Sequence, residues 1–146
     1  MYAIVTGASS GCGYEYARVM ANKGYNLLIV SNEEAIHDKA KLLRQDYPVT
    51  VLSLVQNLGT QTAAKELYDY CQTQGIEVEV LINNAGVYHD CDFLADSEGF
   101  NQLIFNLHMH TPAMLMYYFA QDMVKRGKGY ILNMCSITAD IAVQRL

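Results

Sequence analysis

Two clusters of small and amide side chains have the residue types and spacing to hold a phosphorylated ligand. In the first, Gly7, Gly11 and Gly13 follow a short apolar run and open a helical pattern. Gly7 permits a sharp turn, Gly11 a close approach of the backbone to a ligand, and Gly13 tight packing of the new helix. Ser9, Ser10 and Cys12 lie between these glycines. The free amides and positive dipole end of such a helix suit a pyrophosphate.

The second cluster is Asn83-Asn84-Ala85-Gly86, which directly follows an apolar run. Two amides at the end of a buried strand place hydrogen-bond donors at the carboxyl edge of a sheet, and the small pair leaves room for a ribose. We expect Asn83 to hold the sheet together and Asn84 to contact a ligand. Further along the chain, Asn106 lies in a predicted helix and Ser136 follows the last predicted strand.

The order and spacing of these features resemble the short-chain dehydrogenase/reductase family from residue 2 to about residue 140. The turn reads Thr-Gly-x-x-x-Gly-x-Gly, one residue wider than the Gly-x-Gly-x-x-Gly pattern. The resemblance implies an α/β fold with a Rossmann-type doubly wound parallel sheet, with five strands in the order 3-2-1-4-5 and an incomplete C-terminal edge. It also implies that NAD or NADP binds at the glycine turn and at Asn84, Ala85 and Gly86.

Residues after the second and third predicted strands decide which cofactor fits. The resemblance places the adenosine ribose near Ser31 and Asn32, and the adenine near Asn57 and Leu58. No carboxylate stands at Ser31 to repel a 2′-phosphate, and the hydroxyls of Ser10 and Ser31 could donate to one, but the usual arginine is missing. NAD and NADP both stay open, with NADP slightly favoured. The alternatives are that Ser31 is a solvated loop residue and Asn57 only a turn former.

Chemistry in the family is hydride transfer between the nicotinamide and a carbonyl or alcohol carbon, while a tyrosine exchanges the hydroxyl proton. By resemblance, Ser136 binds the reacting oxygen and Asn106 anchors a water in the proton relay. The family's Tyr-x-x-x-Lys motif is missing, because none of the eleven tyrosines has a lysine four residues later. We therefore expect a truncated chain: the cofactor-binding part of an NAD(P)-dependent oxidoreductase, itself inactive. Its full-length form would act on a small-molecule carbonyl or alcohol.

Two other functions are weighed against this one. A non-catalytic dinucleotide-binding or assembly module would use the same glycine turn without needing Tyr-x-x-x-Lys. A Rossmann-like methyltransferase fits poorly, because its chemistry gives no part to residues 83–86 or to Ser136.

Alternating apolar runs and amphipathic stretches predict the elements that must position these residues. Strands are expected at residues 3–5, 27–30, 49–55, 78–82 and 130–134. Helices are expected at residues 11–23, 32–46, 62–74 and 97–126, the last with Ser97 as its N-cap. Glycine or proline follows each helix. These elements predict a single, partial NAD(P)-binding Rossmann-like domain over residues 1–146.

Composition is that of an ordinary soluble domain, with 146 residues, 51% hydrophobic content and a formal net charge of −5. Dispersed basic residues argue against a nucleic-acid partner. No apolar run is long enough to span a bilayer, and the first strand begins at residue 2, so we expect a cytoplasmic protein with no membrane partner.

The segment His89-Asp90-Cys91-Asp92 contains metal-ligand residue types, but consecutive residues cannot easily converge on one ion. We therefore predict no metal site, and the four widely separated cysteines predict free thiols. The long predicted helix has a thick apolar face, and the fifth strand would be left as a bare sheet edge. Such surfaces predict a homo-oligomer.

Overall fold

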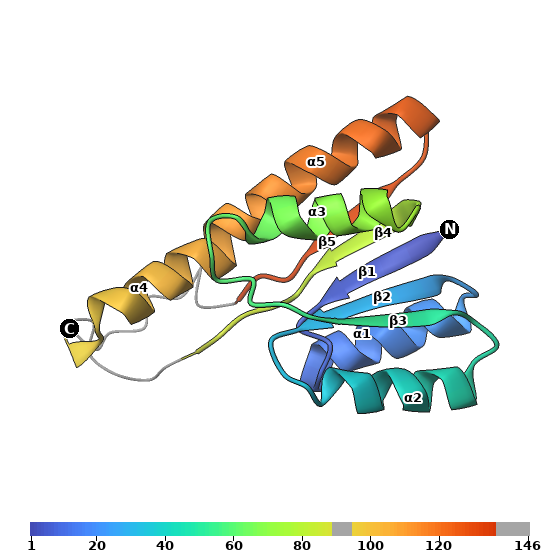
Figure 1. Ribbon diagram of the computed structural model, residues 1–146, viewed down its shortest axis with the longest axis horizontal. Coiled ribbons are helices and arrows are strands. Elements are labelled where there is room, and N and C mark those ends of the chain that lie inside the picture. Colours follow the sequence, from blue (N-terminus) through green and yellow to red (C-terminus); the bar gives the residue numbers. More distant parts are fainter. Residues whose placement is uncertain (89–94, 137–146) are drawn as a thin grey trace.

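A five-stranded parallel sheet forms the centre of the computed structural model, which describes residues 1–88 and 95–136 (Figure 1). The strands, in chain order, are β1 (Tyr2–Thr6), β2 (Asn26–Ser31), β3 (Val51–Val55), β4 (Val78–Asn83) and β5 (Tyr130–Asn133). They lie in the order β3-β2-β1-β4-β5, and all neighbours are parallel. The predicted doubly wound order is confirmed. The winding reverses between β1 and β4, where sheets of this kind hold their ligands.

Helices cover both faces of the sheet (Figure 1). One face packs on α1 (Gly11–Asn22) and α2 (Ile36–Asp46). The other packs on α3 (Ala63–Thr73) and α5 (Thr111–Arg126). Side chains alternate between the two faces along a strand, so both must be apolar when both are covered. This explains the unbroken apolar runs of β1 and β2, whose interior residues are fully buried.

The second helix begins later than residue 32, where the sequence pattern placed it. α2 starts at Ile36 because the preceding residues form a turn. The Oγ of Ser31 accepts a hydrogen bond from the Glu33 N–H at 3.2 Å, and the Ile36 N–H donates to the Glu33 carbonyl at 3.1 Å. A serine side chain that binds the backbone two residues later favours such a turn over a helix.

The long predicted helix over residues 97–126 contains a wider turn. It consists of α4 (Glu98–Phe105), the π-helical η2 (Asn106–His110) and α5. Ser97 caps its start by accepting from the Phe100 N–H at 3.1 Å, as predicted. Pro112 has no N–H, and its ring would clash with the carbonyl four residues earlier. The chain accommodates it by widening, so that the Thr111 N–H donates to the Asn106 carbonyl five residues back.

Among the described residues, the β5 strand is covered on one side only. Ile131 packs with the α3 and α5 side of the core. Tyr130 and Leu132 pair in register with Val80 and Ile82, which face α1 and α2. Tyr130 is 60% exposed and Leu132 39% exposed. No helix within residues 1–88 and 95–136 covers that face of β5. None of the helices in these ranges is long and apolar enough to cross a bilayer.

Candidate cofactor-binding site

A cleft of about 490 Å³ lies at the carboxyl edge of the sheet, beside β1, β2, β3 and β4. Four segments that follow these strands supply most of its lining. The predicted cofactor-binding residues that line it are Gly7, Ser9, Ser10, Cys12, Gly13, Ser31, Asn32, Asn57, Leu58, Asn84, Ala85 and Gly86. Gly11 lines a neighbouring hollow that shares Ser10 and Cys12. The fold therefore brings these residues together, while their contacts with a cofactor stay a prediction.

The turn between β1 and α1 is shaped by close contacts that exclude side chains. A Cβ on Gly13 would lie 2.2 Å from the Gly7 carbonyl oxygen, and one on Gly7 would lie 2.7 Å from the Ala85 Cα. Gly7 and Gly11 have φ of 66° and 53°, which side chains disfavour. Gly11 has no heavy atom near its missing Cβ. The turn is therefore tight on its protein side and open at Gly11.

The amino end of α1 leaves its amides available. Ser10 is the N-cap residue, but its side chain makes no capping hydrogen bond. The first amides of an α-helix lack partners within the helix and need a side chain, water or ligand. Because Ser10 and Cys12 line the cleft, a bound anion at this position could accept hydrogen bonds from these amides and would be favoured by the helix dipole.

Thr6 fastens the segment after β4 to the end of β1. Its Oγ1 accepts hydrogen bonds from the Asn84 N–H at 2.9 Å and the Ala85 N–H at 3.0 Å. The same hydroxyl donates to the Ile82 carbonyl at 3.3 Å. Thr6 is only 2% exposed, so one buried hydroxyl sets the position of two cleft-lining residues.

The two asparagines after β4 have different partners. The Asn83 side-chain amide donates to the Asn133 Oδ1 at 2.9 Å, which joins β4 to β5. It therefore ties the sheet, as expected. Asn84 lines the cleft, but its Nδ2 donates to the carbonyls of Thr6 and Gly7 at 3.0 and 3.3 Å. Asn84 thus has a structural task in the glycine turn in addition to its predicted cofactor contact.

Ser31 is buried at the end of β2, with 5% exposure. Its Oγ donates to the Oγ of Ser9 at 3.1 Å and accepts from the Glu33 N–H. The hydroxyl therefore joins β2 to the glycine turn and shapes the entry to α2. Both of its contacts are therefore made within the protein. The neighbouring Asn32 is exposed and lines the cleft.

The segment after β3 is built around Asn57. Its Oδ1 accepts a hydrogen bond from the Gly59 N–H at 2.9 Å, so Asn57 does form a turn. Leu58 is buried with 4% exposure. Gln56 also lines the cleft. Its Nε2 donates to the Ala63 carbonyl at 3.0 Å, while its buried Oε1 has no partner among the described residues. Gln56 thus carries a buried acceptor without a described partner beside the predicted adenine position.

The two predicted catalytic residues are not among the described residues that line the cleft. Asn106 is 5% exposed. Its Nδ2 donates to the Gly59 carbonyl at 2.9 Å, and its Oδ1 accepts from Gln102 at 3.1 Å. It therefore ties the π-helical turn to the segment after β3. Ser136 is exposed and follows β5. Neither is among the described residues that line the cleft, and their catalytic roles stay predictions.

Sequence reasoning did not identify several residues that shape this region. Glu33, Gln56, Val87, Leu103 and Leu107 also line the cleft. His108 was given no role, yet its Nε2 lies 3.1 Å from the Val87 nitrogen and 3.0 Å from the Val87 oxygen. A Cβ on Gly86 would lie 2.8 Å from the imidazole. The small size of Gly86 is a signal for such close packing, but it does not identify the partner.

Metal-ligand residues do not gather within the described part of the chain, where no group of three or more could hold an ion. Residues 89–92 lie outside the described residues. Cys12, Cys71 and Cys135 are free thiols, as predicted, and Cys91 lies outside the described ranges. Burial raises the pKa of the Cys71 thiol to about 12, so this thiol stays protonated at neutral pH.

Comparison with known proteins gives one family. The family model described as short chain dehydrogenase matches residues 1–146. Very-long-chain 3-oxoacyl-CoA reductase-B of Danio rerio is 28% identical over 142 residues, which are 92% of this chain and 44% of that protein. The chain thus spans less than half the length of this relative.

Solved structures agree in fold. The bulky-bulky ketone specific alcohol dehydrogenase from Comamonas testosteroni superimposes with a TM-score of 0.89 at 28% identity, over 97% of this chain and 57% of that one. A short-chain dehydrogenase from Sphingobium yanoikuyae in complex with NADPH gives a TM-score of 0.88 at 26% identity, over 96% of this chain and 55% of that one.

Proposed function

We propose, from the premise that this chain belongs to the short-chain dehydrogenase family, that it is the cofactor-binding part of an NAD(P)-dependent oxidoreductase. The whole enzyme would transfer hydride between a nicotinamide and a small-molecule carbonyl or alcohol. The names of the relatives support this class, since they include a 3-oxoacyl-CoA reductase and a ketone-specific alcohol dehydrogenase.

The observation that carries this proposal is the start of α1. An uncapped helix end meets a glycine turn that is closed by Gly7 and Gly13 and open at Gly11. Both features lie at the carboxyl edge, beside the reversal of strand order, where doubly wound sheets bind dinucleotides. Unpaired amides and a positive dipole end would bind the pyrophosphate.

Other cleft residues have the chemistry to hold the remaining groups of a dinucleotide. Gln56 lines the cleft, and its buried Oε1 has no described partner. Rotation of this side chain toward the cleft would provide the acceptor that an adenine amino group requires. Ala85 and Gly86 are small enough to leave space for the nicotinamide ribose. When bound, the nicotinamide supplies the hydride chemistry, and the protein supplies orientation and proton management.

Proton management needs groups beyond this cleft. We assign Ser136 to the reacting oxygen and Asn106 to the proton relay, by resemblance to the family. The sequence contains no Tyr-x-x-x-Lys, so no general acid of that type is available within it. We therefore expect the 146-residue chain to bind a cofactor without turning over substrate. A dinucleotide-binding module without catalysis is the second candidate, favoured by the same missing motif.

We further propose a cytoplasmic homo-oligomer. The exposed apolar residues of η2 and α5, with Met109 at 61% and Tyr117 at 59%, support self-association. The sequence leaves both dinucleotides open with NADP slightly favoured, and one structural relative was solved in complex with NADPH. The side chains that would discriminate between the two dinucleotides are treated in the next subsection.

Calorimetric titration of the folded chain with NAD and NADP tests the cofactor proposal. We expect saturable binding of at least one dinucleotide, and no turnover with a panel of ketones and alcohols. A folded chain that binds neither dinucleotide would contradict the proposal. Turnover at rates comparable to those of a version extended through Tyr-x-x-x-Lys would contradict the predicted inactivity.

A further inference from the structure

Among the described residues that line the cleft, one has a charged side chain. Of the aspartate, glutamate, lysine and arginine residues that the structure describes, Glu33 alone is among the lining residues. It lies two residues beyond β2, and Ser31 holds its backbone through the hydrogen bond from the Glu33 N–H at 3.2 Å. Among the described lining residues, the cleft therefore has a carboxylate, and no lysine or arginine, near the predicted ribose position.

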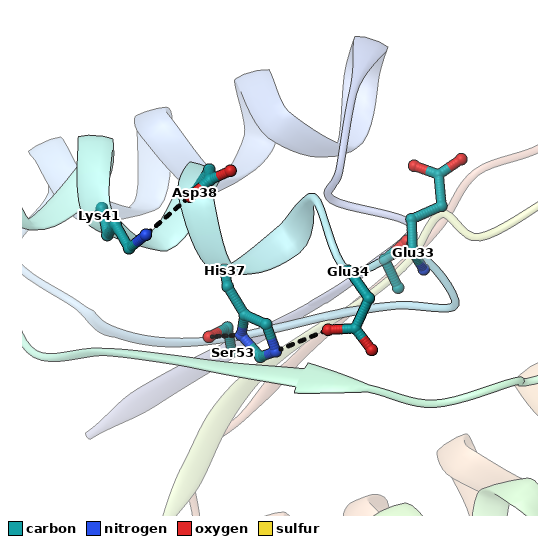
Figure 2. Close-up of polar contacts among 7 residues, drawn as sticks. Glu33, Glu34, His37, Asp38, Lys41 and Ser53 are labelled. Atoms are coloured by element: carbon teal, nitrogen blue, oxygen red, sulfur yellow. Dashed lines mark hydrogen bonds and ion pairs between the residues drawn. The ribbon is translucent and has the colours of Figure 1, made fainter.

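The other charged groups around the start of α2 are paired with one another. The Lys41 Nζ lies 2.8 Å from the Asp38 Oδ1. His37 lies between the Ser53 Oγ, at 2.8 Å, and the Glu34 carboxylate, at 3.5 Å. Figure 2 shows these pairs on one side of the turn, with the Glu33 side chain directed away from His37 and Lys41. Within the described residues, Glu33 has no ion pair.

Lys39, another cation of α2, also has a partner within the protein. The Lys39 Nζ lies over the ring of Tyr14, 4.9 Å from its centroid. Both residues line the neighbouring hollow rather than the cleft itself. A lysine on an aromatic ring gains from the cation–π contact, which opposes its release toward another anion. The Ser31 hydroxyl, a possible phosphate donor, already donates to Ser9.

We propose, resting on the dinucleotide function above, that Glu33 is the specificity-determining residue of this cleft and makes it select NAD. Its carboxylate accepts hydrogen bonds from the 2′- and 3′-hydroxyls of the adenosine ribose. The same negative charge repels a 2′-phosphate, and no lysine or arginine among the described lining residues could neutralise that phosphate. The slight preference for NADP inferred from Ser31 is thereby reversed, because the acid that usually follows β2 stands two residues further along.

The neighbouring Glu34 offers a matched control. It belongs to the same turn and carries the same charge, but its side chain is 84% exposed and directed to His37 rather than into the cleft. The variants Glu33→Gln and Glu34→Gln therefore change the net charge equally. Only the first removes the charge that lines the cleft, and glutamine keeps the length of the side chain.

The experiment measures the affinities of NAD and NADP for the full 146-residue chain and both variants by calorimetry, with circular dichroism to verify folding. We expect the unmodified chain to bind NAD more tightly than NADP. Glu33→Gln should raise the NADP affinity about tenfold and lower the NAD affinity a few-fold, since one charge near the phosphate is removed. Glu34→Gln should leave the ratio of the two affinities unchanged.

The other outcomes separate this inference from the proposed function. Dinucleotide binding with the same NADP/NAD ratio in Glu33→Gln and the unmodified chain would overturn the role of Glu33 and leave the oxidoreductase proposal standing. An equal shift in both variants would assign the effect to general charge and would also overturn it. Failure of the folded chain to bind either dinucleotide would overturn both proposals.

Discussion

The two edges of this sheet differ in how completely the protein satisfies their polar side chains. At the amino edge, the Tyr25 hydroxyl donates to the Glu79 Oε1 at 2.8 Å, and the Lys128 Nζ lies 2.9 Å from the same oxygen. These residues join the starts of β2, β4 and β5. At the carboxyl edge, the Gln56 Oε1 has no partner and Glu33 has no ion pair among the described residues.

The charged side chains differ between the two edges in the same way. Hydrogen bonds from Lys128 and Tyr25 lower the pKa of the Glu79 carboxyl, and Glu79 raises the pKa of Lys128. Glu79 is 3% exposed, so its charge depends on these partners. An edge that satisfies its polar groups internally supports the fold. An edge that leaves donors and acceptors open is available to a ligand. The variants below test this division.

The largest effect is expected from Gly13→Val at the carboxyl edge. A Cβ there would lie 2.2 Å from the Gly7 oxygen and 2.5 Å from the Asn84 Nδ2. The helix must move away from the turn, at a cost of about 3 kcal/mol in unfolding free energy. We expect dinucleotide affinity to fall by roughly a hundredfold or more in calorimetry.

Gly24→Ala is the control for Gly13→Val. Gly24 has a φ of 83° but open space around its missing Cβ, so the cost is backbone strain of about 1 kcal/mol. It follows α1 at the opposite end from the cleft, and dinucleotide binding should persist. Unchanged binding in Gly13→Val would show that the glycine turn is not the pyrophosphate site.

Thr6→Val should have the next largest effect. It removes the hydroxyl that accepts from the Asn84 and Ala85 amides and leaves both donors without that acceptor. We expect a loss of about 2 kcal/mol in chemical denaturation and a weaker dinucleotide affinity. Thr6→Ser keeps the hydroxyl and should cost less than about 1 kcal/mol. Equal losses in both variants would assign the effect to the missing methyl group.

Much of the fold was predictable because its signals are local. Apolar runs, glycine stops and the Ser97 cap each depend on a few neighbouring residues, and they located the strands and most of the helices, although β3 begins at Val51 rather than at residue 49. The exceptions have local causes that competed with those signals. The Ser31 hydroxyl starts a turn where charged residues suggested helix, and Pro112 widens a helix that otherwise reads as continuous.

The candidate site was predictable in part. Residues in the glycine turn and in residues 83–86 follow strands directly, so the strand order alone places them together. Glu33 was missed because the turn after β2 was interpreted as helix. Glu79 was missed because its partners lie far away in sequence: Tyr25 is 54 positions distant. Such pairings depend on which strands become neighbours, and no local pattern contains that information.

Glu79→Gln tests the amino edge. Glutamine keeps the size of the side chain and an acceptor for Tyr25, but it removes the charge that pairs with Lys128. We expect the thermal midpoint to fall by a few degrees and dinucleotide affinity to stay unchanged. A comparable loss of affinity would show that the two edges are coupled, against the division drawn above.

The same variant should alter the acid side of the stability profile. The folded pKa of Glu79 lies below its ordinary value of 4.5, so the folded state binds this proton less readily than the unfolded state. The stabilisation is present above pH 4.5 and is lost as pH falls through the folded pKa. Below pH 4.5, the free energy of unfolding of Glu79→Gln should therefore change less steeply with pH than that of the unmodified chain. Identical pH dependence in the variant and the unmodified chain would contradict the pairing of Glu79 with Lys128.

Glu77→Gln should have the smallest effect, although Glu77 also belongs to an ion pair at the amino edge. Its Oε1 lies 3.3 Å from the Arg126 Nε, and its side chain is 51% exposed. Exposed pairs contribute little because water and salt screen them, so we expect a change within about 0.5 kcal/mol. Arg126 also donates to the Val78 carbonyl, which keeps it in place without Glu77. Chemical denaturation of Glu77→Gln beside Glu79→Gln compares the same substitution in an exposed and a buried pair. A larger loss at Glu77 would mean that burial does not determine which charges hold this edge together.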